Sequence, residues 1–166
     1  MTEETAKGLL EYLLPRVRKE SAITRKVLAA IPAGQCQYKP SERSMSALEL
    51  ATHIAAAEVF FLEGVRNGAF QWKQPDLKTP EDVLAFYDRN VPPLLDQVAA
   101  LSGEKLAQTI TFAGWEEPAV TFLDFSQKHS VHHRGQLSVY LRPMGVKVPS
   151  IYGPSADEGV QTAAGD

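Results

Sequence analysis

Four histidines are the residues of this sequence with the clearest chemical potential, because three of them crowd into one short segment. His129, His132 and His133 lie within five consecutive residues, and His53 lies far upstream. Both segments have helical patterning, and helical residues four apart point the same way, one turn apart. His129 and His133 therefore share a direction. A second helix that brings His53 opposite them would complete three imidazoles, enough for a transition metal with an open position.

The spacing leaves open which two of the clustered histidines bind, since ligand pairs three and four residues apart both occur on helices. We favour His129 with His133, whose angular offset is about 40°, against about 60° for residues three apart. His132 is then a neighbour of the ligands or a group in the substrate cavity. A lone histidine on an apolar stripe is more often a hydrogen-bonded core residue. Here both histidine segments lie on core-facing stripes and the chain has no other histidine, so we predict His53, His129 and His133 as metal ligands.

Three neutral imidazoles would leave the charge of a divalent ion uncompensated. Such a centre favours an anion, a hydroxide or a thiolate in its open position, and it lowers the pKa of a bound water to about 7. A thiol is deprotonated more readily still. Zinc and nickel both suit imidazole ligands, and the sequence does not choose between them. The pattern therefore predicts a Lewis acid that activates a nucleophile.

Polar residues beside the histidines are candidates for supporting roles, each with a structural alternative. Gln136 and Tyr140 follow on the same helix and could line the pocket, or serve only as core or interface residues. Glu49 lies one turn before His53 and could orient its ring, or it could favour the helix dipole as an N-terminal acid. Arg134 could clamp an anionic group, although an exposed helix charge is the commoner arrangement.

Three further residues have side chains that often take part in chemistry or binding. Cys36 has no histidine beside it in the sequence, so it is expected to be a small buried residue rather than a nucleophile. Trp72 and Trp115 fall in predicted loops, where they could rim a cavity or contact a second subunit.

Other catalytic motifs are missing from the sequence. It has no Gly-rich phosphate loop, no His-Glu-x-x-His, no Cys-x-x-Cys, no serine elbow and no pair of Glu-x-x-His motifs of the di-iron bundles. The sequence therefore argues against phosphoryl transfer, Rossmann redox chemistry and di-iron chemistry.

The composition is that of an ordinary globular protein: 166 residues, 44% of them hydrophobic, with a net charge of −3. No block of Lys and Arg appears, which argues against nucleic acid as the main partner. No apolar run is long enough to cross a membrane, and the acidic, polar start is unlike a secretory leader. The single cysteine permits no internal disulfide and fits a reducing compartment. We expect a cytoplasmic protein.

Four helices are predicted from apolar residues spaced three, four and seven apart. The first covers residues 3–30, where Pro15 either starts or bends the helix. The second begins at Ser44 or Ser46 and ends at Gly68. Glu49, three residues beyond Ser46, would complete a capping box. The third begins at Thr79, followed by a proline and two acids, and closes at Gly103.

The third helix should kink, because Pro92 and Pro93 fall within its pattern. A small β-hairpin is predicted next, with strands at 109–112 and 118–121. The last helix is predicted to begin at Thr121, with Asp124 in the reciprocal capping position, and to stop before a proline and a glycine.

No internal repeat and no linker divides the chain. The sequence therefore predicts an all-α fold: one domain over residues 1–166, a four-helix bundle with a small hairpin before the last helix. The first part of the C-terminal tail, with Ile151 and Tyr152, is expected to pack, and the part beyond Glu158 is expected to be loose.

Residues 129–137, His-Ser-Val-His-His-Arg-Gly-Gln-Leu, together with His53 in an Ala- and Ile-rich helix, resemble the DinB-like family. That family is named for damage-inducible proteins and is related to the YfiT-like metal-dependent hydrolases. The ending, Tyr-Leu-Arg-Pro at 140–143 and residues 148–158, is similar to it as well. The resemblance extends over nearly the whole chain.

The resemblance implies an up-down-down-up four-helix bundle, commonly dimeric, that holds a metal with His53, His129 and His133. Characterised relatives include S-transferases that use low-molecular-weight thiols such as bacillithiol or mycothiol, and a mycothiol-dependent isomerase. We therefore expect an enzyme that uses zinc or nickel to transfer such a thiol to an electrophilic small molecule, acting as a homodimer without nucleic acid or membrane. The alternatives are a hydrolase with a metal-activated water and a non-enzymatic metal-binding or stress-response bundle.

Overall fold

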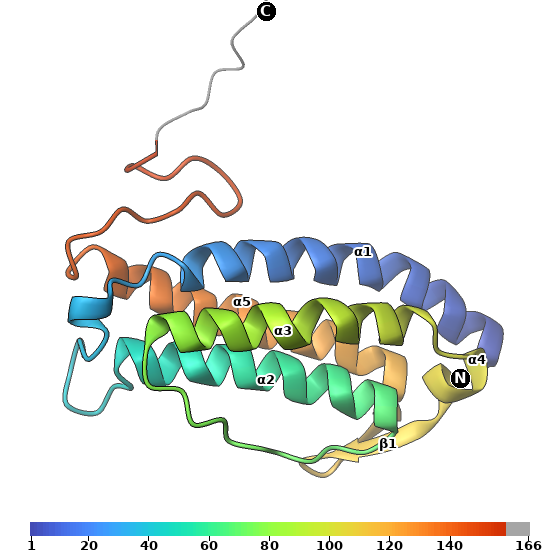
Figure 1. Ribbon diagram of the computed structural model, residues 1–166. Coiled ribbons are helices and arrows are strands. Elements are labelled where there is room, and N and C mark those ends of the chain that lie inside the picture. Colours follow the sequence, from blue (N-terminus) through green and yellow to red (C-terminus); the bar gives the residue numbers. More distant parts are fainter. Residues whose placement is uncertain (159–166) are drawn as a thin grey trace, which may run out of the picture.

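Four long helices form the body of the computed structural model (Figure 1), which describes residues 1–158. They are α1 (Glu3–Leu28), α2 (Ala47–Asn67), α3 (Pro80–Ala99) and α5 (Phe122–Leu141). α1 and α5 run in one direction and α2 and α3 in the other (Figure 1). α2 packs against α3 and α5, and α1 packs against the same two helices. The predicted up-down-down-up bundle is confirmed.

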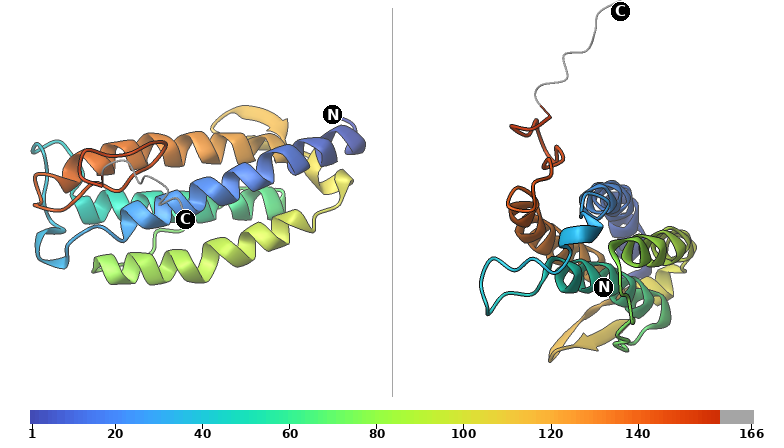
Figure 2. Two further views of the ribbon diagram at one scale, coloured as in Figure 1. Left: turned by 90° about the horizontal axis from the view of Figure 1, so that it is seen from above. Right: turned by 60° about the vertical axis from the view of Figure 1, so that its left-hand side comes forward.

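Three prolines lie inside helices rather than at their ends: Pro15 in α1, and Pro92 and Pro93 in α3. Each lacks the N–H donor of an intrahelical hydrogen bond, which favours bending. A helix start at Pro15 is therefore wrong, since α1 runs through it and curves (Figure 1). The axis of α3 bends in its second half (Figure 2, left), as expected for a kink at the two prolines.

Capping boxes set the starts of α2 and α3. The Ser46 hydroxyl accepts the N–H of Glu49 at 3.1 Å, and the Glu49 carboxylate accepts the N–H of Ser46 at 2.7 Å, so the later of the two serine candidates is the N-cap. Thr79 and Asp82 make the same pair of bonds, at 3.1 and 3.0 Å. Gly68 ends α2 with a φ of 73°, a conformation that favours glycine.

A short helix, α4 (Gly103–Ala107), follows α3, which ends at Ala99, so the prediction that Gly103 closes the third helix is wrong. Ser102 caps α4 by accepting the N–H of Lys105 at 3.2 Å. Gly103 lies against the start of α1, where an added Cβ would stand 2.7 Å from the Cβ of Glu3. The glycine is therefore a point of close approach between helices.

The hairpin is tighter than predicted. β1 (Thr109–Phe112) pairs antiparallel with β2 (Trp115–Pro118), with Phe112 opposite Trp115. Ala113 and Gly114 have φ of 50° and 85°, the two-residue turn that reverses a chain at once. The second strand predicted at 118–121 is therefore wrong. Three of the four residues predicted for that strand form a short 3₁₀ helix instead, η2 (Ala119–Thr121). A second 3₁₀ helix, η1 (Ala33–Gln35), lies between α1 and α2.

The side-chain cap predicted for the last helix is absent. Thr121 has helical φ and ψ of −69° and −25°, whereas an N-cap residue is usually extended. Its hydroxyl donates instead to the carbonyl of Pro118 at 2.7 Å, and Asp124 pairs with Lys128 at 2.6 Å. The capping box at Thr121 and Asp124 is therefore wrong.

The tail after α5 folds back onto the bundle. Gly145, with a φ of 75°, donates its N–H to the backbone carbonyl of Arg142 at 2.8 Å. This glycine ends the helical run, as predicted. Val148 and Ile151 pack against the core. The expectation that its first part packs is met for Ile151, whereas Tyr152 is largely exposed. The expectation for the part beyond Glu158 lies outside the described residues.

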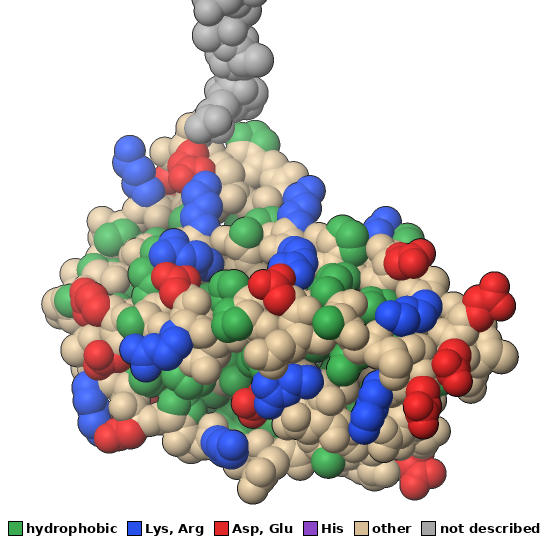
Figure 3. All heavy atoms as spheres, turned by 45° about the vertical axis from the view of Figure 1, so that its right-hand side comes forward, with side chains coloured by type: hydrophobic (Ala, Val, Ile, Leu, Met, Phe, Trp, Pro, Cys, Tyr) green, Lys and Arg blue, Asp and Glu red, His purple; other side chains and the backbone are tan. Residues whose placement is uncertain are grey.

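The surface carries mixed charges. On the face drawn in Figure 3, Lys and Arg side chains are spread singly among acidic and apolar ones. This agrees with the net charge of −3. Within residues 1–158, no helix combines the length and the apolar character that a membrane span needs.

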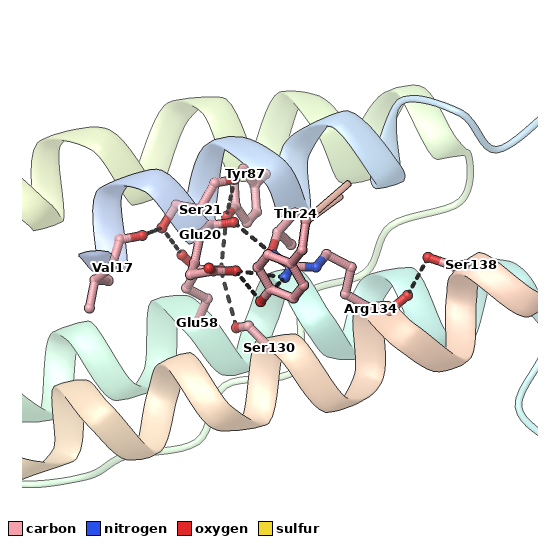
Figure 4. Close-up of polar contacts among 10 residues, drawn as sticks. Val17, Glu20, Ser21, Thr24, Glu58, Tyr87, Ser130, Arg134 and Ser138 are labelled. Atoms are coloured by element: carbon pink, nitrogen blue, oxygen red, sulfur yellow. Dashed lines mark hydrogen bonds and ion pairs between the residues drawn. The ribbon is translucent and has the colours of Figure 1, made fainter. Parts of the chain in front are cut away.

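One buried carboxylate connects the long helices (Figure 4). Glu58 of α2 is 2% exposed, and hydroxyls of the other long helices surround it. Tyr87 of α3 donates to its Oε2 at 2.8 Å, Ser130 of α5 donates to the same atom at 3.3 Å, and Ser21 of α1 bonds to its Oε1. Burial raises the pKa of Glu58, and these hydrogen bonds oppose the rise only in part.

The hydroxyls around Glu58 also lie close to backbone carbonyls of α1. The Ser21 hydroxyl lies 2.9 Å from the carbonyl of Val17, and the Tyr87 hydroxyl lies 3.0 Å from the carbonyl of Ser21. These contacts extend the polar group from the Glu58 carboxyl to the backbone of α1.

Arg134 of α5 forms a second buried polar group with Glu20 of α1. Arg134 is 1% exposed and lies 2.6 Å from the Glu20 carboxylate. It also donates to the Thr24 hydroxyl at 3.2 Å and to Tyr152 of the tail at 2.7 Å. Both predictions for Arg134 are wrong, because its charge is neither exposed nor free to clamp a ligand. It joins the tail to α1 and α5.

Replacing Arg134 with alanine should lower the free energy of unfolding by about 3–5 kcal/mol, because Glu20 would stay buried without its counter-charge. Urea unfolding followed by circular dichroism measures the change. The control is Arg18→Ala, which breaks an exposed pair with Asp96 (side chains 41% and 71% exposed) and should cost less than about 1 kcal/mol. Equal losses in the two variants would contradict the prediction.

Glu58→Gln should stabilise the protein increasingly as the pH rises. The folded-state pKa of Glu58 lies above its ordinary value of 4.5, so the wild type loses stability relative to the glutamine variant as the pH rises through the folded-state pKa. Urea unfolding at several pH values from about 4 to about 8 measures the difference.

Glu49→Gln is the matched control with the opposite sign. The backbone N–H of Ser46 lowers the pKa of Glu49. The Glu49 carboxylate therefore contributes stability above its ordinary pKa, and this contribution is lost as the pH falls through the lowered value. The Glu49→Gln variant should thus become less stable relative to the wild type as the pH rises. A Glu58→Gln difference that does not change with pH would show that Glu58 titrates as in the unfolded chain.

Candidate metal centre

Three histidines converge between α2 and α5. The Nε2 of His53 lies 3.2 Å from the Nε2 of His129 and 3.3 Å from that of His133. One ligand atom from each of the three residues lies within 4.8 Å of the others. His53 comes from α2 and the other two from successive turns of α5, as the spacing predicted. We call these residues the histidine triad; they form a group that could hold a metal ion.

Small residues lie next to His53 in the sequence of α2. Ala51, Ala55, Ala56 and Ala57 are all buried, so this part of α2 lies inside the bundle.

The nitrogen spacing fits a tetrahedral ion. Two nitrogens that each lie about 2.0–2.1 Å from zinc, at a tetrahedral angle, are about 3.3 Å from one another. The two distances measured from His53, 3.2 and 3.3 Å, match that separation. The imidazole donors and these two separations therefore suit a divalent transition metal.

Gln136 orients one of the three rings. The Nδ1 of His133 lies 2.7 Å from the Oε1 of Gln136, an atom that can only accept a hydrogen bond. The proton of neutral His133 is thus on Nδ1, and its Nε2 presents a lone pair toward His53. A hydrogen bond of this kind fixes the tautomer that a ligand histidine needs.

Burial lowers the pKa of all three imidazoles from the ordinary 6.5. For His129 it brings the pKa to about 4, with smaller contributions from the neighbouring histidines. The hydrogen bond that His133 donates to Gln136 raises the pKa of His133, without cancelling the effect of burial. Near neutral pH the triad is therefore uncharged, which is the form that binds metal.

Of the three predicted pocket residues, Gln136 alone hydrogen-bonds to the triad. His132 is exposed on α5 with its ring centroid 4.8 Å from that of His133, outside the convergent group. Tyr140 is 9% exposed, and its hydroxyl donates to the carbonyl of Met45 at 3.3 Å. Tyr140 therefore holds the loop before α2 against α5.

Glu49 does not orient His53. Its carboxylate accepts the N–H of Ser46 at 2.7 Å and lies 3.4 Å from the ammonium of Lys39. The alternative role, an acid at the start of a helix, is confirmed. Cys36 is a half-buried free thiol packed against the core, in keeping with a small packing residue.

A polar cavity of about 650 Å³ opens beside His53. Its walls are the loop before α2, the first turns of α2, and residues 74–77 of the segment that leads to α3. Side chains of both charges line it, among them Lys39, Arg43 and Asp76. A cavity of this volume is large enough for a small molecule.

The two tryptophans differ in their relation to the triad. Trp72 lies against His53, with ring centroids 6.2 Å apart, as expected for a residue at the rim of the site. Trp115 belongs to β2 rather than to a loop and contacts Phe125 at 5.4 Å.

Comparisons with known proteins agree with this architecture. The DinB family model matches residues 1–163. The uncharacterized protein YjoA of Bacillus subtilis is 31% identical over 127 residues, 74% of this chain and 82% of YjoA. The uncharacterized protein YrdA of the same organism is 27% identical over 153 residues, 90% of this chain and 91% of YrdA.

Solved structures show the same fold. The crystal structure of the DinB-like protein YjoA superposes with a TM-score of 0.72 at 25% identity, covering 85% of this chain and 96% of that one. A DinB-like protein from Bacillus cereus gives a TM-score of 0.75 at 22% identity, covering 86% and 97%.

Proposed function

The chain belongs to the DinB family, and from that premise we propose that His53, His129 and His133 bind a divalent transition metal, zinc or nickel, in an enzyme that transfers a low-molecular-weight thiol to an electrophilic small molecule. The observation that carries the proposal is the convergence of three Nε2 atoms, two of them 3.2 and 3.3 Å from that of His53. Three neutral ligands leave room for an anionic fourth.

When bound, such an ion supplies Lewis acidity, which lowers the pKa of a thiol or a water in its open position. Gln136 keeps the proton of His133 on Nδ1, so that the Nε2 lone pair stays available. The polar cavity beside His53 is the proposed place for the thiol, since its lining of both charges suits a small polar molecule. In the reaction the thiol gives its proton to solvent, its sulfur bonds to the electrophilic atom, and the leaving group departs with the bonding electrons.

Hydrolysis is the second candidate function. All three triad histidines are partly exposed, which favours this alternative because water reaches the site. It would use the same ligands with a water in place of the thiol.

The proposal also includes a homodimer in the cytoplasm and a small-molecule substrate. The family resemblance supports the dimer, and the single cysteine supports a reducing compartment.

Protein purified without a histidine tag and then supplied with zinc or nickel should retain about one ion per chain. His53→Ala should weaken the affinity by more than about 100-fold, since loss of an outer residue alone costs about 10–100-fold. Inductively coupled plasma mass spectrometry and a competing chelator measure the content and the affinity.

His132→Ala is the matched control, because it removes a histidine that is adjacent to His133 on α5 but outside the triad. It should bind metal like the wild type. The metal proposal would be contradicted if the wild type stayed metal-free after metal addition, or if His53→Ala and His132→Ala retained metal equally. Circular dichroism checks that each variant is folded.

The metal-loaded protein should consume a thiol such as bacillithiol, mycothiol or cysteine in the presence of 1-chloro-2,4-dinitrobenzene. The rate above background should fall at least about 100-fold on chelation or in His53→Ala, because the ion activates the thiol. A hydrolase would instead turn over an activated ester without thiol. Metal binding without either reaction would favour the non-enzymatic alternative.

A further inference from the structure

Aromatic rings form one continuous group beside the histidine triad. It contains both tryptophans and every phenylalanine of the chain except Phe86, with neighbouring ring centroids 4.9–6.3 Å apart. We call it the aromatic cluster. It meets the triad at two points: Phe61 lies 5.7 Å from the ring of His129, and Trp72 lies 6.2 Å from that of His53.

The cluster is buried on one side and open on the other. Phe61 and Phe122 are 3% and 2% exposed, whereas Trp72 and Trp115 are 45% and 54% exposed. A large aromatic face left in water beside a concave polar site is a typical feature of ligand binding. Trp72 is the closer of the two tryptophans, since Trp115 connects with His129 only through Phe125 and Phe61.

Trp72 lies on the long segment between α2 and α3, which runs along the outside of α2 (Figure 1). No backbone–backbone hydrogen bond joins residues 69–77 to the rest of the described chain. Apolar side chains hold the segment instead. Phe70 packs over Gly64, where an added Cβ would stand 2.1 Å from its ring, and Leu77 packs against the core. Trp72 lies between these two anchors.

The same segment borders the polar cavity. Its residues 74–77 form one wall of that cavity, while Trp72 contacts His53 and the ring of Phe60, at 5.4 Å. The surroundings of His53 therefore combine a polar cavity with an exposed aromatic face.

We propose that Trp72 determines substrate specificity: its exposed ring binds a planar aromatic group of the electrophilic substrate, whose reacting end lies at the triad. This inference rests on the proposed metal site. A planar ring can stack on indole over a large area, and its contact adds to the apolar area it buries. A ligand with an aliphatic group of similar reach gains less from the same face.

Hydroxamates test the inference without any turnover. Acetohydroxamate and benzohydroxamate bind zinc through the same group and differ only in methyl against phenyl. Calorimetric titration of the zinc-loaded wild type should give a dissociation constant about tenfold lower for benzohydroxamate. Trp72→Ala should abolish that preference and leave the affinity for acetohydroxamate unchanged. Trp115→Ala, the matched control, should keep the preference.

Two further measurements keep the test decisive. Trp72→Phe retains a ring and should retain most of the preference, so a folding defect of the alanine variant would not obscure the result. In Trp115→Phe, Trp72 is the only tryptophan, and benzohydroxamate should change its fluorescence more than acetohydroxamate does.

An equal preference for the phenyl group in wild type and Trp72→Ala, or no preference in the wild type, would overturn the inference and leave the metal proposal standing. A wild type that retains no zinc and binds neither hydroxamate would overturn the metal site, and with it this inference.

Discussion

The packing of α2 against α5 is the constraint on which the rest of the structure depends. The histidine triad exists only where these two helices meet, since His53 lies on one and His129 and His133 on the other. The cost is the burial of imidazoles next to one another, which is why their pKa values fall below 6.5 and why they remain neutral ligands at physiological pH.

The buried polar groups fix the rotation of α5 about its axis. Ser130 and Arg134 each follow a triad histidine by one residue, and they lie four apart, on one face of the helix. That face is held by hydrogen bonds to Glu58 and by the ion pair with Glu20. A rotation of α5 would break both contacts and leave charged groups buried without partners, which is costly. The same contacts therefore direct the histidines on the adjacent face toward α2.

Local patterns in the sequence were sufficient for most of the elements. Apolar periodicity located the four long helices, and the capping residues Ser46 and Thr79 located two helix starts, because such bonds involve residues only three apart. Errors arose where a local rule had a competitor. Thr121 is a good capping residue by type, but η2 gives it a helical backbone. Glu116 and Glu117 disfavour a strand by propensity, yet the tight turn at Gly114 places them in β2.

By itself the sequence determined the helical fold, which follows from apolar spacing along each helix. It also offered the triad as candidate ligands, from the spacing of His129 and His133 and the core-facing stripe that carries His53. It did not determine the partners of its buried charges. Arg134 looks in sequence like any helix arginine, and Glu58 only stands out as an acid on a buried face; their partners lie 18 to 114 residues away. Only the tertiary structure decided those pairings and the meeting of Trp72 with His53, because such contacts depend on how distant helices pack and no local pattern encodes them.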